Sequence, residues 1–320
     1  MRTWAPLCLL VVTLFTFCFA NAESIPDVPR LLKSASKGDL DALFMLGLAY
    51  ESGHGVAQDF AAAARWYQLA ADRGHSGAQS RLGSLYARGQ GVPQDETAAV
   101  KWYLRAAVQG DPDAQTNLGC MYFNGEAGLR LDYAEAARWF AKAAAQHNQF
   151  AEANLATLHS EGMGVPRDLD KAASLFLDAA RQGNLYSQVR LAWMYEHGVG
   201  FHQDLADALR WDRAAARHDY PPAWNNLGYL YEHGLGVPRN FPEAARLYCE
   251  AAASRLPAGE RNWAILRSTL KDLPGNCDGA ARWLASAPEE PENPAESIEA
   301  GPKIPQEDST VPGALVSRKQ

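Results

Sequence analysis

The residues whose spacing most resembles a reactive site are two copies of a Glu-His-Gly tripeptide, at 196–198 and 232–234. A further histidine, His54, stands in a comparable position beside a turn. Histidine can bind zinc, but two histidines on one ion must both reach it at about 2.1 Å. Equivalent positions on neighbouring packed helices lie roughly 9–10 Å apart. Polar helix ends therefore explain these residues better, and we expect neither a metal nor another cofactor.

Other catalytic patterns are missing from the sequence. It contains no G-x-S-x-G elbow, no phosphate-binding loop, no H-E-x-x-H motif and no C-x-x-C pair. The net charge is −7, and basic residues are not clustered. Electrostatic binding to nucleic acid or to an anionic membrane is therefore not expected. The sequence favours a protein that binds a partner over one that catalyses a reaction.

The elements that must position these residues are helical hairpins. Each copy begins with Leu-Gly or Leu-Ala, and successive copies are 36, 36, 37, 36 and 36 residues apart. An aromatic residue usually follows four positions after the leucine, which places both on one helix face. Next comes a turn whose first glycine suits the left-handed position after a helix end. The repeat leucines are Leu46, Leu82, Leu118, Leu155, Leu191 and Leu227.

A second helix follows each turn. It begins after an aspartate or asparagine, whose side chain can accept hydrogen bonds from the first backbone amides of a helix. A large side chain and a pair of alanines follow, as in Trp66 with Ala70 and Ala71, so that helices approach closely and the gap between them is filled. The predicted N-caps are Asp59, Asp95, Asp132, Asp168, Asp204 and Asn240.

The shared pattern, L-G-x-x-Y-x-x-G-x-G-V-x-x-D-x-x-x-A-x-x-W-[YF]-x-x-A-A-x-x-G, resembles the Sel1-like repeat, a relative of the tetratricopeptide repeat with a longer turn. The resemblance covers residues 41–255 in six full copies. It implies an all-α fold, a right-handed α-solenoid, that binds proteins or peptides. The departures are local, because residues 126–131 disrupt the third turn and His159 replaces a tyrosine.

Both ends of the array are predicted to be incomplete repeats that cap the stack. Residues 23–40 form an N-terminal half-repeat, and residues 256–287 form a degenerate seventh repeat whose first helix spans 260–273. Residues 1–22 have the positive start, apolar run and Ala-Asn-Ala ending of a secretory signal peptide, with an uncleaved membrane anchor as the alternative. After cleavage no integral membrane segment is expected. Residues 288–320 are rich in proline and glutamate and are predicted to be a disordered acidic tail.

Three cysteines remain after signal-peptide cleavage, so they cannot all pair. Cys249 and Cys277 are the natural pair in an oxidising compartment. Their separation of 28 residues differs from the repeat length, which places one Cα about 12 Å below the other along parallel helices. A disulfide needs Cα atoms within about 7 Å. The spacing therefore argues against this disulfide.

The resemblance also implies where a partner binds, because solenoids of this type use a concave face lined by the first helix of each repeat. By analogy with related hairpin repeats, the positions are two before, two after and five after the repeat leucine. Repeats five and six place aromatic residues and an asparagine, which can bond a peptide backbone, beside two carboxylates, a composition that suits interface hot spots. The alternative is that both aromatic residues belong to the core. The predicted groove residues are Phe44, Cys120, Phe123, Trp193, Glu196, Asn225, Tyr229, Glu232 and Arg261.

The predicted function is a non-enzymatic protein- or peptide-binding scaffold of the cell envelope. The signal sequence indicates export, most simply to a bacterial periplasm, with the extracellular space or the endoplasmic reticulum lumen as alternatives. Two other functions stay open. Some cysteine-rich relatives of the repeat family are assigned penicillin-binding or β-lactamase activity, although this chain lacks their cysteine pair in each repeat. An exported factor that acts on host proteins is the other.

Overall fold

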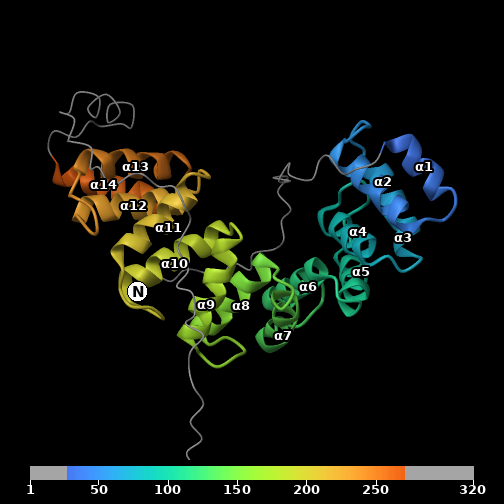
Figure 1. Cartoon of the computed structure of the whole chain (residues 1–320), viewed down its shortest axis with the longest axis horizontal. Helices are drawn as coiled ribbons and strands as arrows, with labels where there is room; N and C mark the ends of the chain where they lie inside the picture. The colour runs from blue at the N-terminus through green and yellow to red at the C-terminus, as the bar shows by residue number, and fades with distance from the viewer. Residues whose placement is uncertain (1–26, 271–320) are drawn as a thin grey trace, which may run out of the picture.

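The computed structural model describes residues 27–270, and this part of the chain consists of 14 α-helices without strands. After α1 (Val28–Ala35), six helical hairpins follow one another along an arc (Figure 1). In this view α6 and α8 lie toward the inner side of the arc, and α7 and α9 lie toward its outer side. The first helices of repeats one to six are α2 (Leu40–Ser52), α4 (Ser76–Arg88), α6 (Pro112–Asn124), α8 (Gln149–Glu161), α10 (Leu185–His197) and α12 (Pro221–His233). The second helices are α3 (Phe60–Ala71), α5 (Glu96–Val108), α7 (Tyr133–Ala144), α9 (Leu169–Arg181), α11 (Leu205–Ala216) and α13 (Phe241–Ala253).

The last described helix, α14, spans Pro257–Thr269. It begins three residues before the predicted start at 260, since a proline suits the first turn of a helix. It ends before the predicted limit of 273, because Leu270 has extended backbone angles. The predicted signal peptide (1–22), the tail (288–320) and Cys277 lie outside the described residues, so these predictions stay open.

Capping residues define both ends of the turn inside each hairpin. All six predicted N-caps are confirmed, and Asp95 Oδ1, for example, accepts a hydrogen bond from the Ala98 amide at 2.9 Å. Each first helix ends at a glycine with φ between +65° and +75°, a conformation that other residues adopt at a cost. The turns are therefore fixed by residue type rather than by a partner.

The second glycine of the turn serves contact between repeats. A Cβ atom on Gly91 would lie 2.2 Å from the carbonyl carbon of Phe60, at the start of the preceding second helix. The turn of repeat two thus rests directly on repeat one. The third turn departs from this plan, as expected, and both Ala127 and Gly128 take positive φ there.

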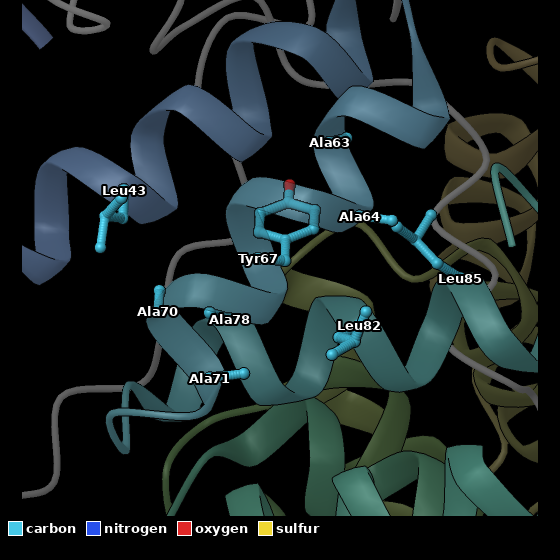
Figure 2. Close-up of a cluster of buried hydrophobic side chains, with 9 residues drawn as sticks. All are labelled: Leu43, Ala63, Ala64, Tyr67, Ala70, Ala71, Ala78, Leu82 and Leu85. Carbon is cyan, nitrogen blue, oxygen red and sulfur yellow. The ribbon is translucent and has the colours of Figure 1, made fainter. Parts of the chain in front are cut away.

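The core explains why a small residue follows each repeat leucine. A Cβ atom on Gly47 would lie 2.3 Å from the ring of Tyr67, so α2 and α3 cross closely only because position 47 has no side chain. Figure 2 shows Tyr67 in the middle of the cluster that joins repeats one and two. Its members are Leu43, Ala63, Ala64, Tyr67, Ala70, Ala71, Ala78, Leu82 and Leu85. The same crossing recurs where Gly83 meets Tyr103.

Candidate partner-binding surface

Trp193 of α10 and Tyr229 of α12 occupy the same position in successive repeats and are both exposed. Their exposed fractions are 37% and 39%, so the interpretation that they belong to the core is wrong. Ile265 of α14 stands 36 residues beyond Tyr229 and is 53% exposed. Large apolar residues exposed at one position of three successive first helices are typical of an interaction surface. We call Trp193, Glu196, Tyr229 and Glu232 the Trp193–Tyr229 surface.

Histidines hold the two aromatic side chains in place. The rings of Trp193 and His197 are stacked at 4.5 Å between centroids, and those of Tyr229 and His233 lie 4.1 Å apart. Each histidine Nδ1 lies 3.0 Å from the backbone carbonyl of its aromatic neighbour, to which an Nδ1–H tautomer donates. The two Glu-His-Gly tripeptides therefore support the exposed aromatic residues of the Trp193–Tyr229 surface. The spacing of four residues between aromatic and histidine was the signal for this role in the sequence.

The carboxyl groups of this surface are partly withdrawn from solvent. Tyr248 donates a hydrogen bond of 2.7 Å from its hydroxyl to Glu232, whose side chain is 20% exposed. Burial raises the pKa of Glu196 above its ordinary value. Behind it, burial raises the pKa of Asp212 well above the ordinary value, and Asn226 donates a 3.3 Å hydrogen bond to Asp212 Oδ1. The surface thus presents aromatic rings beside two carboxyl groups, and burial raises the pKa of one of them, Glu196.

Three predicted groove residues are buried. Cys120 is fully buried, and its Sγ lies 3.6 Å from Asn154 Nδ2. Phe123 packs edge-on against Tyr133, with 5.2 Å between the ring centroids. Asn225 Oδ1 accepts a 2.8 Å hydrogen bond from Asn262 Nδ2 between neighbouring first helices. The prediction that these three side chains face a partner is corrected, because each meets a neighbouring helix or turn residue instead.

The remaining predicted residues lie at the ends of the array. Phe44 in repeat one is half-buried and stacks on His75 at 4.6 Å. Arg261 is exposed on α14, one repeat beyond Asn225. The structure therefore brings together the predicted residues of repeats five and six and leaves Phe44 apart from them.

Arg190 is the residue of this region that the sequence reasoning missed. Its guanidinium carbon lies 5.6 Å from the ring centroid of Phe176 and 5.7 Å from that of Trp193. Its Nε is buried and makes no hydrogen bond. The predicted groove positions did not include the residue just before the repeat leucine, where Arg190 stands.

Neither a metal-binding cluster nor a membrane-spanning helix is found in the part of the chain that the structure describes. Between residues 27 and 270, no group of three or more His, Cys, Asp or Glu side chains is arranged to hold a metal ion. None of the helices in this range is both long enough and apolar enough to cross a bilayer. The aromatic rings and carboxyl groups of the Trp193–Tyr229 surface suit contact through stacking and hydrogen bonding.

Comparison with known proteins identifies the repeats. The Sel1 repeat matches residues 40–75, 76–111, 112–148, 149–184, 185–220 and 221–255. Among solved structures, the chain resembles c5321, a protective antigen of uropathogenic Escherichia coli with an SLR fold, at 33% identity and a TM-score of 0.65. That match covers 79% of this chain and 54% of the E. coli protein, so the chain spans about half of that relative's length.

A second structure agrees on the fold. A Sel1 repeat protein from Oxalobacter formigenes is 26% identical with a TM-score of 0.61, and the match covers 70% of this chain and 96% of that protein. No curated protein matches significantly. With six matched repeats over most of its length and this helical architecture, the chain belongs to the Sel1 repeat family and folds as an α-solenoid.

Proposed function

We propose that this protein is a non-enzymatic scaffold that binds a protein or peptide partner through the Trp193–Tyr229 surface. Sel1 repeat proteins are commonly scaffolds for protein interactions, which supports a protein partner. The observation that carries the proposal is the exposure of Trp193 and Tyr229 at one position of adjacent repeats. Aromatic residues of this kind supply most of the binding energy at many interfaces.

The local geometry makes both rings suitable anchors. His197 and His233 already hold them, so that little side-chain freedom is left to lose when a partner binds. Glu196 and Glu232 stand beside the rings as hydrogen-bond acceptors for the partner. This combination favours a peptide that packs apolar side chains on the rings.

We also propose that the protein acts in the cell envelope, most simply in a bacterial periplasm. The signal-peptide features of residues 1–22 support export. The E. coli relative is described as a protective antigen, and recognition by a host's immune system is easiest for a protein outside the cytoplasm. Fractionation of cells that express the full chain tests this location, and recovery in the cytoplasm would contradict it.

Affinity capture from envelope extract, followed by titration of the captured partner, tests the surface. The double variant Trp193→Ala/Tyr229→Ala should bind at least about 100-fold more weakly, since each hot-spot residue contributes about 2 kcal/mol or more. The matched control is Leu69→Ala/Leu104→Ala, which removes side chains that are 43% and 44% exposed on second helices. Equal loss in both variants, or no loss in the first, would contradict the proposal. Nitrocefin hydrolysis by the pure protein would contradict its non-enzymatic part.

A further inference from the structure

Where one repeat packs against the next, three equivalent positions on three helices can be compared, and we call each such contact region a junction. At the first junction, between repeats one and two, Glu51 lies in the last turn of α2, Tyr67 lies on α3 and Arg81 lies on α4. The Tyr67 hydroxyl donates a hydrogen bond to Glu51, and Arg81 Nη1 lies 3.7 Å from the other carboxylate oxygen. Glu51 is only 6% exposed. The carboxylate is therefore held inside the protein by one hydrogen bond and one ion pair, and we call this junction closed.

The fourth junction, between repeats four and five, keeps the arginine and loses its partners. Ser160, Phe176 and Arg190 each stand 109 residues after Glu51, Tyr67 and Arg81. Serine has no carboxylate, and the Ser160 hydroxyl donates to the backbone of α8 instead. Phenylalanine has no hydroxyl to orient an acceptor.

Two further acids are also replaced. Asp111 and Asp113 both act on Arg81 and raise its pKa together with Glu51, against the effect of burial. The corresponding residues near Arg190 are Tyr220 and Pro222, which carry no charge at neutral pH. Burial raises the pKa of Tyr220 to about 12.

Arg190 thus has no acidic partner among the described residues. It forms no ion pair with any residue between 27 and 270, and its buried Nε makes no hydrogen bond. A buried donor without an acceptor costs free energy that a suitable ligand can recover. The rings of Phe176 and Trp193 flank the guanidinium, an arrangement that holds an arginine by cation–π attraction and fixes its plane.

We infer that Arg190 binds the carboxylate of an aspartate or glutamate side chain in an extended peptide partner. The incoming carboxylate pairs with the accessible part of the half-buried Arg190 side chain, and the planar guanidinium fork matches it. Trp193 lies beside Arg190 and belongs to the Trp193–Tyr229 surface, so one peptide can reach both. This inference rests on the proposed function and adds the charge of the partner to it.

The test begins with random dodecapeptides displayed on phage and selected on the full-length protein. Selected peptides are synthesised with a fluorophore, and their affinities are measured by anisotropy. We expect the selected peptides to share an acidic residue, and its replacement by the amide to weaken binding at least tenfold. On the Arg190→Met variant, the acidic and amide peptides should bind equally.

A second variant keeps the inference testable even where Arg190→Met folds poorly. Ser160→Glu/Phe176→Tyr rebuilds the first junction around Arg190 and supplies an internal carboxylate. We expect this variant to melt at a higher temperature than the wild type and to bind the acidic peptide at least tenfold more weakly. Arg81→Met is the matched control, since it removes an arginine that is already paired and should leave the acid preference unchanged.

The outcomes separate this inference from the proposed function. Peptides that need Trp193 and Tyr229, but bind Arg190→Met and the rebuilt variant as tightly as the wild type, overturn the role of Arg190 alone. Peptides whose affinity is unchanged by substitution at all five positions (Trp193, Tyr229, Arg190, Ser160 and Phe176) overturn both proposals. A selection that enriches no peptide also overturns both.

Discussion

The first and fourth junctions of this solenoid have the same backbone plan and opposite electrostatic states. At the first, Glu51, Tyr67 and Arg81 satisfy one another inside the protein. At the fourth, Arg190 is left with aromatic neighbours and an unsatisfied Nε. Residues that recur in each repeat build the stack, whereas a residue that departs from the repeat can leave a polar group without its partner, as at Arg190. The difference between the junctions therefore points to function more directly than the consensus does.

The largest expected effect comes from breaking the closed junction. Arg81→Met leaves the buried Glu51 without its cation, which should lower the free energy of unfolding by about 3 kcal/mol. Arg190→Met breaks no ion pair within the described residues and should change it by less than about 1 kcal/mol. Urea denaturation followed by circular dichroism measures both. Equal losses in the two variants would show that the junctions do not differ in this way.

A smaller effect is expected from the helix crossing of repeat one. Gly47→Ala places a methyl group against the ring of Tyr67 and should destabilise the protein by about 2 kcal/mol. In repeat five the corresponding residues are Ala192 and Asp212, so this crossing already accepts a methyl group. Ala192→Gly should therefore cost only the helix propensity, about 1 kcal/mol. Thermal melts of the two variants compare the crossings, and a more stable Gly47→Ala protein would contradict the packing argument.

A third comparison concerns the pH dependence of stability. Glu152 carries a carboxyl group at a position where three other repeats have glutamine. Gln79, Gln115 and Gln188 each donate to a backbone carbonyl of the preceding second helix. Glu152 cannot donate once ionised, and burial, with a contribution from Asp178, raises its pKa to about 7.

Since the pKa of Glu152 is raised on folding, its stabilising contribution is complete below the unfolded value of about 4.5. That contribution is lost as the pH rises through about 7. Glu152→Gln should match the wild type near pH 4.5 and be about 2 kcal/mol more stable at pH 8. Thermal melts of the wild type and the variant between pH 4.5 and pH 8 test this prediction. Gln115→Glu is the reverse control, since it introduces an acid at the same position of another repeat. A constant difference between wild type and variant at all pH values would contradict the role of ionisation.

Much of the fold could be predicted because the repeat sequence encodes individual contacts. Gly47 is required by the ring of Tyr67, and Asp95 is required by the free amides of α5. The same register predicted the exposed position of Trp193, yet the equivalent Cys120 is buried, since burial also depends on neighbouring repeats. A rule based on one repeat cannot contain that information.

Arg190 escaped sequence reasoning for the same reason. An arginine before a repeat leucine is ordinary in this chain, as Arg81 shows. What leaves it unpaired among the described residues is the loss of acidic and hydroxyl groups on other helices, at Ser160 and Phe176 and again at Tyr220 and Pro222. A comparison of whole junctions, rather than of single repeats, would have found it.

The most direct test of this account is the affinity of a selected acidic peptide for the wild type and for Ser160→Glu/Phe176→Tyr, measured by fluorescence anisotropy beside the melting temperatures. Closing the fourth junction should weaken binding at least tenfold while the melting temperature rises. An unchanged affinity in a variant that is folded and more stable would contradict the claim that the open junction is where the partner binds.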